Sequence, residues 1–262
     1  LLGETGEDFV LLLEEDDGTS KWYSYDWSGD IPCGLCKQIN NITSKSRHVV
    51  QIAFGPSGEW YVYGEKADGS GGHHWWGGID TDCSDSIRSC LGNDLQVSFG
   101  CNSSWVIIKG RNGYGYSGDI PDGLVERIKD TNKQKDLIKF VRLLPPSSDY
   151  YASAPNYFMA DSKGTQWNGL GEHFSKNLKG GGGDEVLDVA QAGDNSWIVI
   201  RPNRYIASTG ISNRLTSRLS QFYREQKTRR EQANQKIREY DDIILRVEIE
   251  AAAAARAAEE EK

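Results

Sequence analysis

The stretch Trp27-Ser-Gly-Asp-Ile-Pro32 returns further along the chain as Tyr116-Ser-Gly-Asp-Ile-Pro121. Each copy is followed by two apolar residues four positions apart, Leu35/Ile39 and Leu124/Ile128. Shorter versions of the same outline are Trp76-Gly-Gly-Ile79, Trp167-Asn-Gly-Leu170 and Ser208-Thr-Gly-Ile211. A motif that recurs at such intervals indicates tandem structural repeats.

An aromatic residue opens an apolar run close to every copy of the motif. These residues are Phe9, Trp60, Trp105, Tyr150 and Trp197, with spacings of 51, 45, 45 and 47 residues. The runs are rich in β-branched and aromatic residues, which favours strands. The apolar pair after the glycine favours one or two helical turns. We therefore expect a mainly β fold over residues 1–212, built of five units of three antiparallel strands and a short helix.

A three-stranded sheet cannot bury both faces alone, so such units are expected to stack on their neighbours. In period and in aromatic–glycine usage, residues 1–220 resemble β-propellers of the tectonin and kelch kind, whose blades repeat about every 40–50 residues. The resemblance implies a five-bladed, propeller-like ring. The sequence lacks the Trp-Asp ending of WD40 blades. No functional residue is carried over from these families. An open, twisted row of the same units is the alternative.

Two units depart from the common pattern. The first has no upstream strand, because Leu1-Leu2-Gly3 supplies only its last residues, so we expect a longer chain or another segment to complete it. In the fourth unit, residues 152–162 are expected to form a modified hairpin loop. Asp30 and Asp119 occupy matching places just before two of the short helices, where we expect them to act as helix caps.

Residues 213–262 predict one long charged helix, because glycine and proline are absent and apolar residues recur at three- and four-residue steps. A helix this long favours a partner helix or groove, and we expect the chain to dock on other protein subunits through it. The alternative is a solvated helix held by its own charge pairs. The residues expected to contact the partner are Leu219, Phe222, Ile237, Tyr240, Ile244 and Val247.

Charge is distributed unevenly along the 262 residues, whose formal net charge is −8. Residues 1–212 carry 19 Lys/Arg against 28 Asp/Glu, which argues against nucleic acid as a partner because phosphate binding needs a cationic face. No run of 18 apolar residues exists, so no membrane span is expected. No signal-peptide pattern opens the sequence. An odd cysteine count and the long charged helix favour an intracellular location.

All five cysteines precede residue 102. Cys33-Gly-Leu-Cys36 has the spacing of a redox or zinc motif, but it falls at a short helix of a meander unit rather than in a βαβ unit. A disulfide between Cys83 and Cys90 is one possibility, a zinc site using both pairs is another, and reduced cysteines packed between units are the third. We predict no metal and no cofactor.

The pair His73-His74 with Trp75 follows the glycine-rich stretch Gly69-Ser-Gly-Gly72. Two imidazoles beside an indole could hold a metal or a sugar, whose apolar C–H face stacks on aromatic rings. We therefore list His73, His74 and Trp75 as candidate ligand-binding residues. The alternative interpretation is a hairpin tip with ordinary strand residues.

No phosphate loop, nucleophile elbow or metalloprotease helix is present in the sequence. We therefore expect a non-catalytic scaffold, not an enzyme, that serves as a subunit of a larger assembly. The alternative is a repeat lectin or a small-molecule-binding propeller, with carbohydrate as a possible ligand.

Overall fold

The computed structural model describes residues 1–2, 5–16, 21–90, 95–110, 113–146, 155–179, 185–193 and 196–260, with only the backbone given for 14–16, 21–24 and 252–260. The chain divides into two compact units, Leu1–Thr216 and Ser217–Lys262. The first is β-rich, and the second belongs to the long helix α5 (Asn213–Glu260), which begins where the charged tail was expected to begin.

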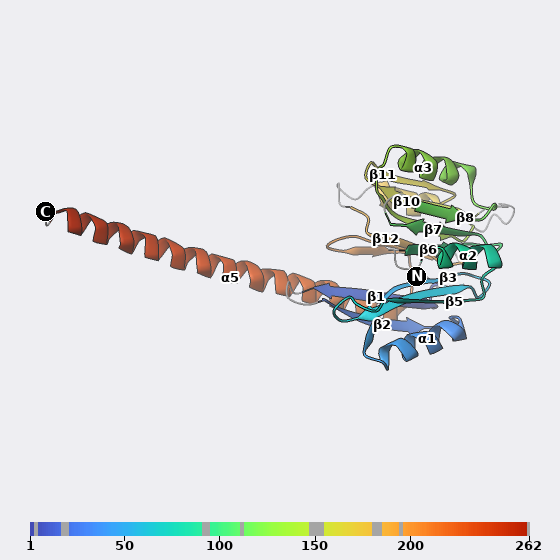
Figure 1. Cartoon of the computed structure of the whole chain (residues 1–262), viewed down its shortest axis with the longest axis horizontal. Helices are drawn as coiled ribbons and strands as arrows, with labels where there is room; N and C mark the ends of the chain where they lie inside the picture. The colour runs from blue at the N-terminus through green and yellow to red at the C-terminus, as the bar shows by residue number, and fades with distance from the viewer. Residues whose placement is uncertain are drawn as a thin grey trace. The chain divides into compact units, whose positions relative to one another are not determined.

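The β-rich unit consists of small antiparallel meanders, each followed by a helix (Figure 1). The sheets are β1 (Phe9–Asp16) with β2 (Lys21–Ser28), β3 (Arg47–Phe54) with β4 (Trp60–Lys66) and β5 (His73–Gly77), β6 (Leu95–Phe99) with β7 (Trp105–Lys109) and β8 (Gly113–Tyr116), β9 (Ile138–Leu144) with β10 (Asn156–Asp161) and β11 (Gly164–Asn168), and β12 (Asp188–Gln191) with β13 (Trp197–Ile200) and β14 (Tyr205–Ala207). The helices after the first four are α1 (Cys33–Thr43), α2 (Thr81–Arg88), α3 (Asp122–Lys133) and α4 (Glu172–Lys179). The mainly β fold of small antiparallel sheets is confirmed: four sheets have three strands and the first has two, and short helices follow the first four sheets whereas the long helix α5 follows the fifth. No closed ring or barrel is shown among the described residues.

The first sheet is completed by only two residues of an upstream strand, as expected. Leu2 bridges to Phe9, and the Val10 N–H donates to the Leu1 carbonyl at 3.1 Å. These two residues therefore stand where β3, β6, β9 and β12 stand in the other sheets.

The fourth unit differs from the sequence prediction. Residues 156–161 are not a hairpin loop but the central strand β10, and Tyr150 lies outside the described residues. The residue that takes the expected place is Tyr157, which is buried and lies opposite Asn168 of the aromatic-x-Gly motif. Phe9 lies opposite Ser28 in the same way. The prediction of the loop was wrong because a longer connection separates β9, which ends at Leu144, from β10, which begins at Asn156, and displaces the central strand from the even spacing.

A buried polar residue precedes each of the five central aromatics. These residues are Asp8, Glu59, Ser104, Asn156 and Ser196. In the first unit the Asp8 Oδ1 accepts the Asp30 N–H at 2.9 Å. The motif glycine allows this side chain to approach, because a Cβ on Gly29, whose φ is +76°, would lie 1.9 Å from Asp8 Oδ1. The glycine thus supplies both a left-handed backbone and space.

Asp30 and Asp119 do not cap the helices that follow them, which corrects the prediction. The residues before α1 and α3 are Pro32 and Pro121, and neither helix has a side-chain cap. The Asp30 backbone N–H instead donates to the Asp8 carboxylate. Pro32 and Pro121 occupy the N-cap positions, and a proline side chain has no atom that could accept a capping hydrogen bond.

The core lies between consecutive sheets rather than within one sheet. Each of four apolar clusters combines two neighbouring sheets with the helix that joins them. In the cluster around α3, for example, Leu124 and Ile128 are fully buried between Val106 of one sheet and Tyr157 of the next. The apolar pair after each motif therefore fixes one unit against the next.

Candidate functional site

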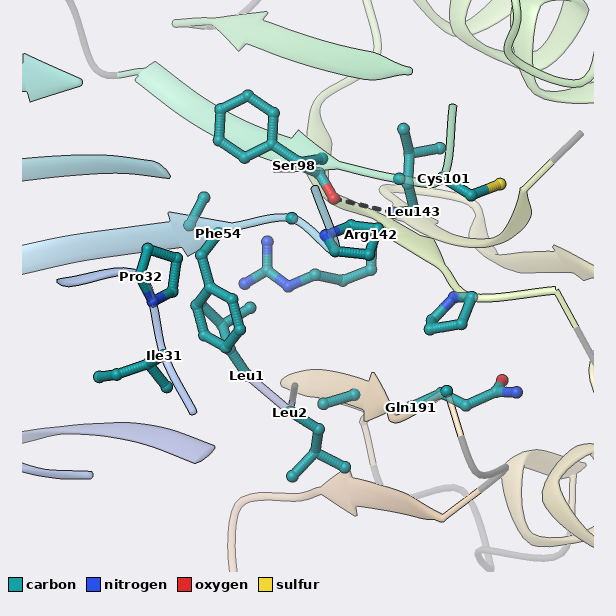
Figure 2. Close-up of a pocket in the computed structure, with 18 of the residues that line it drawn as sticks. Leu1, Leu2, Ile31, Pro32, Phe54, Ser98, Cys101, Arg142, Leu143 and Gln191 are labelled. Carbon is teal, nitrogen blue, oxygen red and sulfur yellow. Dashed lines mark hydrogen bonds between the residues drawn. The ribbon is translucent and has the colours of Figure 1, made fainter. Parts of the chain in front are cut away.

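One candidate site in the β-rich unit is a cavity of about 670 Å³ (Figure 2). Its lining comes from β3, β6, β9 and β12 with their flanking turns, and from Leu1, Leu2 and residues 30–33 of the first unit. The apolar part of the lining includes Leu1, Leu2, Phe54, Phe99, Leu143 and Val189. Such a volume falls in the range of small-molecule sites, about 300–1,000 Å³.

Arg142 of β9 is the charged side chain that reaches into the cavity in Figure 2. Its Nε and Nη2 donate to the Asp188 carboxylate at 2.8 and 2.9 Å, a bidentate pair between β9 and β12. The guanidinium carbon also lies 5.5 Å from the centre of the Phe140 ring. Both interactions fix the orientation of the guanidinium, and the carboxylate balances its charge.

Arg142 also borders a second cavity of about 330 Å³, which Tyr63, His74 and Gln96 help to line. Arg142 therefore lines both cavities, and strands β3, β6 and β9 contribute residues to each of them. Sequence reasoning missed this residue. The only available signal was a separation of 46 positions between Arg142 and Asp188, close to one repeat.

The structure does not gather His73, His74 and Trp75 into one cluster. They alternate along β5, so His74 points to the face opposite the other two. His74 Nδ1 lies 2.7 Å from the Tyr61 hydroxyl, and burial together with His73 lowers the pKa of His74. Trp75 packs against the apolar cluster around α1. The contacts of His74 and Trp75 are those of ordinary strand residues. His73 is the one of the three whose side chain is exposed.

All five cysteines are free thiols in this structure, so the possible Cys83–Cys90 disulfide is not formed. Both side chains are buried in the cluster around α2, where Cys90 Sγ donates to the Ser86 carbonyl at 3.0 Å. Burial raises the pKa of Cys83 to about 12, with Asp80 and Glu59 adding to the effect. Of the possibilities, packed reduced thiols fit these two cysteines.

The Cys33–Cys36 pair opens α1, and burial together with Cys33 raises the pKa of Cys36. An attacking thiol has a lowered pKa, so Cys36 does not have the property of the attacking member of a reactive pair. Within the ranges given above, no three His, Cys, Asp or Glu side chains gather closely enough to hold a metal ion.

The second candidate site is the apolar stripe of α5. The side chains of Ile237, Tyr240, Ile244 and Val247 are 57%, 66%, 55% and 59% exposed. Leu219, in contrast, is only 2% exposed, and Phe222 is half-buried. The expected contact residues therefore divide into a buried start of the helix and an exposed stripe further along it. Sequence reasoning also missed three exposed apolar residues, Ile243, Leu245 and Ile249.

Protein-family models, curated proteins and solved structures give no match to this chain. No helix among the described residues is both long enough and apolar enough to cross a bilayer. The candidate sites therefore rest on the residues of this chain alone.

Proposed function

We propose that the protein is a non-catalytic scaffold that joins a larger assembly through the exposed apolar stripe of α5, defined as Ile237, Tyr240, Ile244 and Val247. The observation that supports this most is that all four side chains are more than half exposed. Single exposed apolar residues are ordinary on protein surfaces, but a contiguous apolar patch commonly marks an interaction site.

The spacing of the stripe supports a helical or grooved partner. Steps of three and four residues place all four side chains along one line of the helix. The helix has 48 residues, about 72 Å at 1.5 Å per residue. Most helical stability in proteins comes from packing of an apolar face, so covering the stripe would stabilise the segment that carries it.

The oligomeric mass of the full chain in its native cellular extract tests this proposal. The double substitution Ile237→Glu/Ile244→Glu should reduce the assembly to the single 29.2 kDa chain. The control is Asp242→Lys, a charge change on the side of the helix facing away from the stripe, which should leave the assembly intact. Assembly that survives the double substitution, or a wild-type chain found only as a monomer, contradicts the proposal.

We also propose that the five sheets close into a five-bladed ring. Two contacts between the start and the end of the β-rich unit support this: Ser212 N–H donates to the Gly6 carbonyl at 2.9 Å, and Arg214 pairs with Asp26. The cavity bordered by all five units supports it as well. In hydrogen exchange, the Ser212 amide should be protected to the same degree as central-strand amides, and rapid exchange would argue for an open row.

A second candidate function is binding of a small apolar molecule in the cavity of about 670 Å³. Its lining combines apolar side chains with the fixed guanidinium of Arg142, which is the usual composition of such sites. Titration with a fragment library should then give one bound molecule per chain, with weaker binding in Leu143→Trp, whose larger ring reduces the cavity volume. Several equivalent glycans per chain would instead favour the repeat lectin, and Trp75→Ala tests that alternative.

A further inference from the structure

We propose that the partner covering the α5 stripe is a second copy of this chain, and that the two helices pair antiparallel, centred on Asp242. The inference rests on the proposed function and names its partner. It comes from the order of charges along α5 and from the register in which two stripes can meet.

The apolar positions follow a heptad pattern from residue 233 to residue 251. Ile237 and Ile244 occupy the first core position of successive heptads, and Tyr240 and Val247 occupy the second. Ala233 and Ala251 extend the same seam at its two ends. The stripe is thus about three heptads long and nearly symmetric about its centre.

An antiparallel alignment centred on Asp242 lets the two stripes cover each other without burying a charge. Ile237 then faces Val247 of the second copy, and Tyr240 faces Ile244 of the second copy. Ala233 meets Ala251 at both ends. A shift of one heptad in one direction brings Arg230 into the seam opposite Val247. A shift in the other direction sets Asp241 against Glu248, where two like charges repel.

The charges beside the seam favour the same register. Lys236 and Glu250 flank the apolar stripe on one edge, so each lysine faces the glutamate of the second copy in the antiparallel pair. Ile243, also on this edge and 55% exposed, meets its own counterpart at the centre. Asp241 lies on the other edge and meets its counterpart. The register therefore has one repulsive contact and two attractive ones, the Lys236–Glu250 pairs.

The order of charge along the whole segment separates antiparallel from parallel pairing. Residues 224–238 carry six cations and two anions, whereas residues 239–251 carry one cation and five anions. In the antiparallel register centred on Asp242, residues 233–238, with Lys236 and Arg238, lie beside residues 246–251 of the second copy, with Glu248 and Glu250, while residues 239–245 lie beside their own counterparts. Parallel helices place like beside like along the whole length, which costs free energy at ordinary ionic strength.

Sedimentation equilibrium of the purified full chain tests the proposal, with circular dichroism as the control for helix content. The wild type should have twice the 29.2 kDa mass of one chain. Lys236→Glu and Glu250→Lys should each weaken the dimer about tenfold, because two attractive pairs become repulsive. The combined Lys236→Glu/Glu250→Lys variant should recover dimerisation. In a parallel pair Lys236 faces Asp241, so the combined variant would not recover.

The matched control is Asp242→Lys, which makes the same change of charge as Glu250→Lys but at a position that faces away from the seam. The dissociation constant of the dimer should stay within about twofold of the wild-type value. A chain that stays monomeric at every concentration overturns self-pairing, yet the extract experiment above can still show assembly with another protein. A dimer that the combined variant does not restore overturns the antiparallel register.

Discussion

Replacing Gly29 by alanine should destabilise the β-rich unit through two separate effects. Gly29 has a φ of +76°, which costs an L-residue roughly 1–2 kcal/mol. The new Cβ would also fall 1.9 Å from Asp8 Oδ1, so the carboxylate must move and give up its bond to the Asp30 N–H. Loss of a hydrogen bond to a buried charged group costs about 1–3 kcal/mol. We expect a total loss of about 2–5 kcal/mol.

Two other glycines separate these effects. Gly118 occupies the same place in the motif of the third unit, but it has neither a positive φ nor an atom within 4 Å of a built Cβ. Gly118→Ala should therefore change stability by no more than about 1 kcal/mol, in either direction. Gly58 has a φ of +90° with open space around it. Gly58→Ala should show the backbone cost alone, about 1–2 kcal/mol.

Urea unfolding followed by tryptophan fluorescence measures all three variants against the wild type. The order of loss should be Gly29→Ala, then Gly58→Ala, then Gly118→Ala. If Gly29→Ala is no more destabilised than Gly58→Ala, the close approach of Asp8 has no energetic weight. Equal effects at Gly29 and Gly118 would refute the reasoning altogether.

Three further outcomes are expected. Burial raises the pKa of Asp8, but hydrogen bonds from Asp30 and Thr5 lower it further, so the net pKa lies below its usual value. The ionised carboxylate therefore stabilises the fold above about pH 4. This stabilisation is lost as pH falls through the lower pKa of the folded state. Urea unfolding from pH 6 to pH 2 should show this acid loss diminished in Asp8→Asn. Maleimide labelling with peptide mapping should modify exposed Cys33 and leave buried Cys83 unmodified until the chain unfolds. Leu219→Ala, at a side chain 2% exposed, should cost about 2–5 kcal/mol.

Each outcome has a result that contradicts it. An unchanged acid profile in Asp8→Asn would mean that this carboxylate is not linked to stability. Labelling of Cys83 at the rate of Cys33 would contradict its burial in the cluster around α2. A negligible effect of Leu219→Ala would show that the start of the helix gains nothing from its burial.

The repeated unit could be predicted because its signals are local. The aromatic-x-Gly motif, the apolar pair such as Leu35/Ile39 and the tight turns each depend on a few neighbouring residues. The same locality explains the error in the fourth unit. Tyr157 follows a long connection and lies 52 residues after Trp105, so the even spacing of the series favoured Tyr150 instead.

The cavity and the Arg142–Asp188 pair could not be predicted because they depend on how sheets meet. Neither residue belongs to a motif, and their contact is set by the packing of β9 beside β12. For the same reason the sequence could not separate Leu219 from Ile237, since both fit one apolar stripe. Burial distinguishes them, and burial is a tertiary property.

A crystal structure of the full chain gives the most direct measurement of the repeat. The five sheets should superimpose so that Phe9, Trp60, Trp105, Tyr157 and Trp197 coincide. Their partners on the next strand or just after it should coincide too, namely Ser28, Gly77, Ser117, Asn168 and Ser208. Different registers at these five positions, or apolar clusters confined within single sheets, would contradict a fold built from one repeated unit.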